Sequence, residues 1–204
     1  MIRFLLCVLM SALMAVPAGA ANLVKTYSYF TIRGRTLDDI QRELSRHGPK
    51  VNTTGLRHPG ATRMAFTTRI GYADRGSSCR IASAVVTVKA HVILPRWRQG
   101  GRTDPDVRIF WDTLSADIKR HEERHVEIAK NHARDLEAAL LASGSQDSCK
   151  DAAAKAKEIT ARVLASHDRA QADFDRVEGI NFESRILRLL RYRMERIQSG
   201  QLPG

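Results

Sequence analysis

The stretch "DPDVRIFWDTLSADIKRHEERHVEIAKNHARDLEAALL", residues 104–141, decides the fold of this chain. Asp104 supplies a helix cap. Pro105 suits the first turn of a helix, because a backbone N–H at that position would have no acceptor within the helix. Apolar side chains then recur every three or four residues, which is the spacing of one helical face. They are Val107, Trp111, Leu114, Ile118, Ala129, Leu136 and Leu140. The stretch therefore predicts a long helix with one buried face.

A second long helix is expected after the break "ASGSQDS" at residues 142–148. It should run from about Ser148 to Val177, because the same apolar spacing returns there. Its stripe consists of Ala152, Ala156, Ile159, Val163, Ala170 and Phe174. Two long helices joined by a short loop lie antiparallel, so the second half of the chain predicts a helical hairpin.

The first half of the chain predicts strands around one short helix. "TYSYFTI" (26–32) is rich in aromatic and β-branched residues, as strands are. Residues 35–49 predict a short helix, with Thr36 and Asp39 as a capping pair and a stop at Gly48. Residues 61–72 and 79–97 predict two further strands, and Pro95 should end the last one or place it at a sheet edge. The fold class is α+β: a small antiparallel or mixed sheet with one short helix, followed by the helical hairpin.

The first 20 residues, "MIRFLLCVLMSALMAVPAGA", have the pattern of a secretory signal peptide. One positive charge precedes an apolar core, and small residues stand before a cleavage point after Ala20. We therefore expect an exported protein, periplasmic or secreted. Residues 21–183 are expected to form a single domain, and residues 184–204 a basic C-terminal helix or tail.

Two cysteines remain after removal of this leader, Cys79 and Cys149. In an oxidising compartment such a pair favours a disulfide. The bridge would close a loop of about 70 residues, worth roughly 4 kcal/mol in the chain-entropy model. The alternative is two unpaired, buried thiols.

The formal net charge is +11, which suggests acidic partners. Export argues against nucleic acid, and the low aromatic content gives little support for stacking on bases. The tail "SRILRLLRYRMERIQ" (184–198) interleaves arginines with apolar residues. It predicts either a helix packed on the domain or weak contact with an anionic membrane surface. The oligomeric state stays open.

The motif "HEERH" (121–125) lies within the first long helix, and its two histidines fall on the apolar stripe. Imidazoles four residues apart on a helix can converge on one zinc ion. Glu122 stands where the general base of a zinc hydrolase does, able to take a proton from water and return it to a leaving amine. The alternative is a pair of buried, hydrogen-bonded histidines. Polar neighbours off the stripe should carry ordinary surface charge: Glu123, Arg124, Glu127 and Lys130.

A catalytic zinc site needs a third protein ligand. If the hairpin turns near residue 145, His167 lies opposite the histidine pair. Asp173, Asp175 and Glu178 lie farther along, where the chain could curl back. His132 better suits a core or hydrogen-bonding role, since it lies about 10 Å beyond His125 along the helix. His91, on the other face of its strand, is a weaker candidate.

Several short motifs, in order, resemble those of the DUF922 family of predicted secreted zinc-dependent proteases. They are "YFTIRG", "HGP", a cysteine opening a strand that runs to "ILPRW", a tryptophan ahead of "HEERHVEIA", a second cysteine, and "ADFD". The resemblance implies zinc ligation by His121 and His125, catalysis by Glu122, and a Cys79–Cys149 bridge.

The family pattern continues from a Tyr-Asp pair into Thr-x-His-Gly, and this chain departs from it. It reads "FDRVEGIN" (174–181), so Ile180 stands in the histidine position. Glu178 is the first candidate for the third ligand, and His167 is its rival.

The sequence thus predicts an exported zinc metallopeptidase that acts on a peptide or protein substrate, and the net charge of +11 makes acidic substrates candidates. An extended substrate is expected to pair with the strand that ends at Pro95. Two alternatives keep the same fold: a non-catalytic basic envelope binding module and a structural zinc protein.

Overall fold

The computed structural model describes residues 21–51, 55–99 and 103–203. The expected signal peptide at 1–20 lies outside the described residues. Within those ranges, no helix is both long and apolar enough to cross a membrane.

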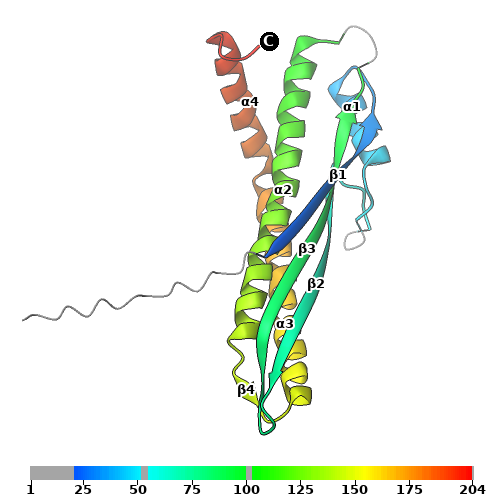
Figure 1. Cartoon of the computed structure of the whole chain (residues 1–204). Coiled ribbons are helices and arrows are strands. Elements are labelled where there is room, and N and C mark those ends of the chain that lie inside the picture. The colour runs from blue at the N-terminus through cyan, green and yellow to red at the C-terminus, as the bar shows by residue number, and fades with distance from the viewer. Residues whose placement is uncertain (1–20, 52–54, 100–102, 204) are drawn as a thin grey trace, which may run out of the picture.

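A mixed sheet forms one layer of the molecule (Figure 1). It contains β1 (Asn22–Ile32), β2 (Ala61–Asp74) and β3 (Cys79–Trp97), in the order β1-β3-β2. β1 runs parallel to β3, and β2 runs antiparallel to it. The short strand β4 (Ser145–Gln146), from the loop between the long helices, pairs with the first residues of β3. The predicted α+β class, with a mixed N-terminal sheet, is confirmed.

β3 is the central strand of the sheet, and its two neighbours pair with different parts of it. β2 pairs with β3 only as far as the Ala61–Ile93 pair, whereas β1 continues to Trp97. Pro95 therefore lies in a final segment of β3 with one neighbour, as suits a residue without an N–H. β3 has neighbours on both sides from Thr87 to Ile93, so a substrate strand cannot pair with that part of it. At Pro95 the described residues place a paired strand on one side only, and the expected pairing of a substrate there stays a prediction.

The short helix α1 (Leu37–His47) begins with the predicted capping box. The side chain of Thr36 accepts a hydrogen bond from the Asp39 backbone N–H at 3.1 Å, and Asp39 accepts one from the Thr36 N–H at 3.1 Å. Ile40 and Leu44 are buried. The cap and the buried stripe together fix this helix at one end of the sheet.

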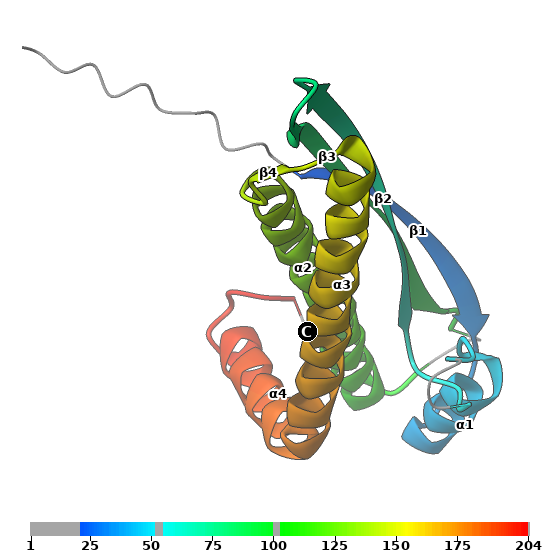
Figure 2. The ribbon, with the colours of Figure 1, turned by 90° about the horizontal axis from the view of Figure 1, so that it is seen from below.

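The long helices α2 (Pro105–Leu141) and α3 (Cys149–Ile180) form the predicted antiparallel hairpin and cover one face of the sheet (Figure 2). Two groups of buried side chains join α2 to the sheet. One contains Val92, Leu94, Leu114 and Ile118, and the other contains Val86, Val88, Leu136 and Leu140. α2 therefore rests on the central strand along much of its length.

The C-terminal helix α4 (Phe182–Gln198) packs beside α2 (Figure 1). Ile186 is buried, and Arg185 lies 3.1 Å from the carboxylate of Asp117. Arg193 lies 2.9 Å from Asp112. The sequence allows two arrangements for residues 184–198, and these contacts match the one in which the helix packs on the domain. The domain boundary at 183 and the membrane contact stay predictions.

A disulfide joins Cys79 to Cys149. It links the first residue of β3 to the first residue of α3, next to the β3–β4 pairing. The predicted bridge is confirmed, and the alternative of two free thiols is wrong.

Candidate metal centre

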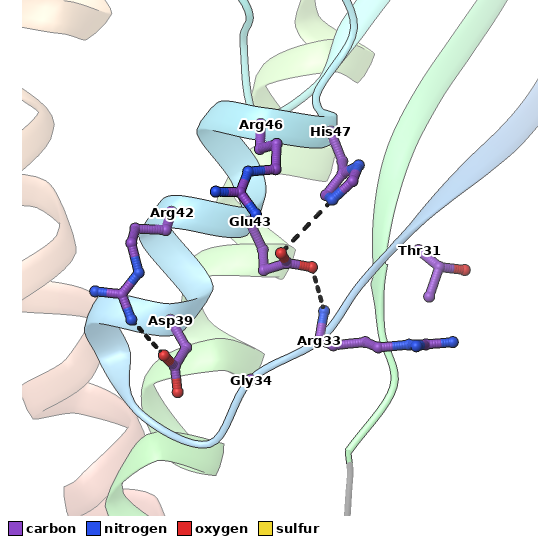
Figure 3. Close-up of a pocket in the computed structure, with 8 residues that line it drawn as sticks. All are labelled: Thr31, Arg33, Gly34, Asp39, Arg42, Glu43, Arg46 and His47. Atoms are coloured by element: carbon purple, nitrogen blue, oxygen red, sulfur yellow. Dashed lines mark hydrogen bonds and ion pairs between the residues drawn. The ribbon is translucent and has the colours of Figure 1, made fainter.

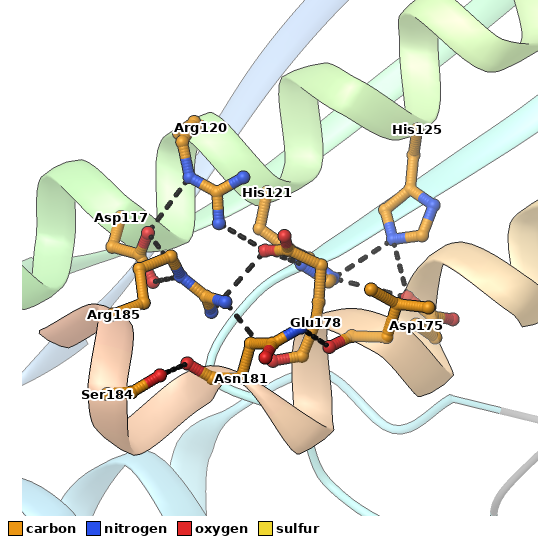
Figure 4. Close-up of polar contacts among 10 residues, drawn as sticks. Asp117, Arg120, His121, His125, Asp175, Glu178, Asn181, Ser184 and Arg185 are labelled. Carbon is orange, nitrogen blue, oxygen red and sulfur yellow. Dashed lines mark hydrogen bonds and ion pairs between the residues drawn. The ribbon is translucent and has the colours of Figure 1, made fainter.

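Three possible metal ligands meet between the two long helices (Figure 4). His121 and His125 project from α2, and Asp175 projects from α3. The Nε2 atoms of the two histidines lie 3.1 Å apart. Oδ1 of Asp175 lies 3.3 Å from Nε2 of His121 and 3.1 Å from Nε2 of His125. Four-coordinate zinc with bonds of ~2.0–2.1 Å holds its ligand atoms about 3.3 Å apart. The triangle therefore fits one face of such a tetrahedron.

Gln171 of α3 orients His125. Nδ1 of His125 donates to Oε1 of Gln171 at 2.6 Å, so that Nε2 remains free to face the other two ligand atoms. The side-chain amide of Gln171 donates in turn to the backbone carbonyl of His125 at 3.1 Å and to Nε2 of His167 at 2.9 Å. Partners of this kind fix the tautomer and ring orientation of metal-binding histidines.

The side of the cluster formed by α3 also carries an aromatic ring. Phe174 stacks on His121 with ring centroids 4.9 Å apart, and it meets the ring of His125 edge-on at 5.1 Å. Both imidazoles are thus held against one rigid group, which limits their rotation.

The charges in the cluster reinforce one another. Burial raises the pKa of Asp175, but its bonds to His121 and His125 outweigh this and hold the pKa far below its usual range. Burial lowers the pKa of His125, but its bonds to Asp175 and Gln171 outweigh this and leave the pKa raised. A cation bound here would take the place of the imidazolium charge.

Glu122 is 5% exposed and faces the sheet. Its Oε2 accepts a hydrogen bond from the hydroxyl of Thr62 at 2.8 Å. Burial raises the pKa of Glu122, while the Thr62 bond and the two imidazoles oppose this rise in part. A β-carbon at Gly60 would lie 2.8 Å from Oε1, so only glycine lets this backbone approach so closely. Glu122 is therefore a buried carboxyl within electrostatic range of the histidine pair.

The two residues predicted as rivals for the third ligand position both lie near the cluster but are held by other partners. The carboxylate of Glu178 pairs with Arg120 and with Arg185, and lies 3.6 Å from Nδ1 of His121. His167 bonds to Asp168 at 3.0 Å and to Gln171. Of these three residues, Asp175 is the one with an oxygen within 3.3 Å of both Nε2 atoms. Ligation by Glu178 or His167 stays a prediction.

The register of the hairpin explains this difference. His167 faces His132, with ring centroids 5.6 Å apart, and does not face His121 or His125. The loop after α2 continues along the sheet as β4 before α3 begins, which shifts the two helices past each other by several residues. The spacing of Gln171, Phe174, Asp175 and Glu178 on one helical face was the sequence signal that could have located this side of the site.

Two other histidines and one glutamate of the motif also form specific hydrogen bonds. His132 bonds to the carbonyl of Ile128 within α2, at 2.9 Å. His91 bonds to Thr26 and Ser28 of β1 at 2.9 Å each. Glu123, expected to carry ordinary surface charge, forms a surface ion pair with Lys25 and bonds to Tyr27, both of β1. It therefore connects the motif to the edge of the sheet.

A charged hollow of about 470 Å³ lies between α1 and the end of β1 (Figure 3). Its carboxylates are already engaged. Asp39 caps α1 and pairs with Arg42, and Glu43 accepts a bond from the backbone N–H of Arg33 at 3.1 Å. This hollow therefore offers no set of free metal ligands.

The fold and the cluster define a class: a mixed α+β protein whose helical hairpin carries three side chains that could hold a metal ion. The chain belongs to the family described as bacterial protein of unknown function (DUF922), whose model matches residues 27–183. No curated protein and no solved structure matches the chain. That description leaves the activity of the family open.

Proposed function

We propose that this chain is a zinc-dependent peptidase in which His121, His125 and Asp175 hold the metal. The observation that carries the proposal is the triangle of ligand atoms, with sides of 3.1, 3.1 and 3.3 Å. Nitrogen and carboxylate donors suit zinc, and three protein ligands leave a fourth position for water. The side chain of Asp175 is 56% exposed, which supports an open site rather than a closed structural one.

Zinc at this position would polarise a peptide carbonyl and lower the pKa of bound water. Glu122 would act as the general base. Its carboxylate accepts a proton from the water that attacks the carbonyl carbon, and delivers it to the nitrogen when the carbon–nitrogen bond breaks. Its raised pKa supports this assignment, because a base works best when its pKa approaches the working pH.

Metal analysis and one substitution test this function. We expect one zinc ion per purified chain and cleavage of a broad peptide library. Glu122→Gln should retain zinc but reduce cleavage by at least about 100-fold, the usual contribution of a general base. Cleavage at the native rate would exclude Glu122 as the base.

The same measurements separate the two alternatives. A protein that binds zinc but cleaves no peptide, and whose zinc is not exchanged by an added chelating ligand, would be a structural zinc protein. If the native protein contains no metal, the non-catalytic basic binding module is the function that remains. The peptidase requires both zinc and cleavage.

A further inference from the structure

An apolar pocket of about 550 Å³ lies beside the candidate metal centre, on the side of α1 opposite the charged hollow. Its floor is formed by buried side chains of two helices. These are Ile40 and Leu44 of α1 with Leu114 and Ile118 of α2. Leu37 and Phe182 stand at its rim, each 44% exposed. The volume is within the range of small-molecule sites, and the exposed rim shows that the pocket opens to solvent.

One pocket residue, Ile118, lies close to Glu122. Ile118 lies one helical turn before Glu122, so both side chains fall on the same face of α2. Gly60 touches both: a β-carbon there would lie 2.9 Å from Cγ2 of Ile118 and 2.8 Å from Oε1 of Glu122. The floor of the pocket therefore comes within one helical turn of the group that we assign as general base.

We propose that this pocket binds a large apolar side chain of the peptide substrate, next to the bond that is cleaved. The inference rests on the proposed function, and it names the substrate class. A leucine or phenylalanine side chain would cover apolar wall that now faces water. An acidic side chain would lose its hydration on the apolar floor. The one arginine among the lining residues, Arg57, is exposed and donates to the backbone carbonyl of Gly48 at 2.7 Å. The net positive charge of the chain would then attract the rest of an acidic substrate, while the pocket selects the residue at the cleaved bond.

Binding of short peptides tests the pocket separately from cleavage. The probes are fluorescein-labelled peptides of glycine and serine with one central residue: leucine, phenylalanine, alanine or aspartate. Affinities are measured by fluorescence anisotropy with the native chain in EDTA, which prevents metal-dependent cleavage. We expect the leucine and phenylalanine peptides to bind at least about tenfold more tightly than the other two, the discrimination typical of an apolar pocket.

Two matched variants of α1 assign the binding to this pocket. Ser45 lines the pocket, and its neighbour Arg46 lines the charged hollow on the other side of the helix (Figure 3). Both are exposed, so a tryptophan at either position should leave the fold intact. Ser45→Trp should abolish the preference for leucine and phenylalanine, and Arg46→Trp should keep it. Gln41→Trp, at another exposed pocket position, serves if Ser45→Trp fails to fold.

Equal affinities for all four peptides, or equal effects of the Ser45 and Arg46 variants, would overturn the pocket assignment. Cleavage of the same peptides by the zinc-loaded chain is measured separately from their binding. Selective binding without cleavage keeps the pocket and refutes the peptidase. Cleavage that ignores the central residue refutes the pocket alone.

Discussion

The two imidazoles that face Asp175 determine its protonation state. Its side chain is more than half exposed, yet its bonds to His121 and His125 hold its pKa far below the usual range. The group is therefore a carboxylate at any pH at which a zinc site can load. Its near neighbour Asp173 lies on the same helix and is paired with Arg176 at 3.2 Å.

Substitution of Asp175 should weaken zinc binding more than substitution of any other residue of α3. Asp175→Ala should lower zinc affinity by more than about 100-fold, because even residues that only orient ligands contribute about 10- to 100-fold. Competition with a chromophoric chelator measures this. Glu178→Ala should cost about tenfold through the orientation of His121, and Asp173→Ala should cost nothing. A larger loss in Glu178→Ala or His167→Ala would instead assign the third ligand as the sequence predicted.

The first turn of helix α1 is stabilised by its capping box and by the chain turn that precedes it. The backbone N–H of Arg35 and then the side chain and N–H of Thr36 lower the pKa of Asp39 to about 2. These bonds form only once the chain has turned at Gly34, whose φ of 126° favours glycine. The capping box and the turn therefore support each other.

The capping box predicts an acid-dependent loss of stability. Because the pKa of Asp39 is depressed on folding from 3.8 to about 2, its contribution is present above the unfolded value and is lost as the pH falls toward 2. In urea unfolding, Asp39→Ala should be less stable than the native chain at pH 7, and the difference should shrink at pH ~2.5. Thr36→Ala should cost about 1 kcal/mol at neutral pH. Asp38→Ala, outside the box, is the control, and an equal loss there would contradict the assignment.

Helix α4 is held by ion pairs that extend to the candidate metal centre. Arg185 pairs with Asp117, which is 4% exposed, and with Glu178, which approaches His121. Arg185→Ala should lower the free energy of unfolding by about 2 kcal/mol, because it leaves a buried carboxylate with Arg120 as its remaining partner. Arg188→Ala, at an exposed position of the same helix, should change it by less than about 0.5 kcal/mol. Chemical denaturation compares the two, and equal effects would refute a structural role for Arg185.

The elements could largely be predicted from the sequence, because their signals are local. The Thr36–Asp39 cap, the 105–141 stripe and the strand that opens at Cys79 each depend on residues close together in the chain. The third member of the cluster depends on the register between α2 and α3, which the β4 pairing shifts. Long-range pairing of this kind leaves no periodic signal, so Asp175 was only one of several acidic candidates on the same helix. The environment of Glu122 likewise depends on Thr62 and Gly60, which are distant in sequence.

A disulfide between Cys79 and Cys149 links the two halves of the described chain. Cys79→Ser with Cys149→Ser should lower the free energy of unfolding by roughly 4 kcal/mol, since the bridge closes a long loop in the unfolded chain. Urea unfolding of the native chain and the double variant, with and without reductant, measures this. Reductant should destabilise the native chain only. An unchanged midpoint in the double variant would contradict the expectation.

The position of that bridge has a consequence for how the protein matures. It anchors the start of the helix that carries Asp175, whereas both histidines belong to the other long helix. In a reducing compartment α3 loses this anchor, and its carboxylate is less firmly aligned with the imidazoles. We therefore expect oxidation to precede efficient metal capture, so that a newly made chain stays inert until it reaches an oxidising environment. Zinc affinity that is identical in the reduced and oxidised chain would exclude this order of events.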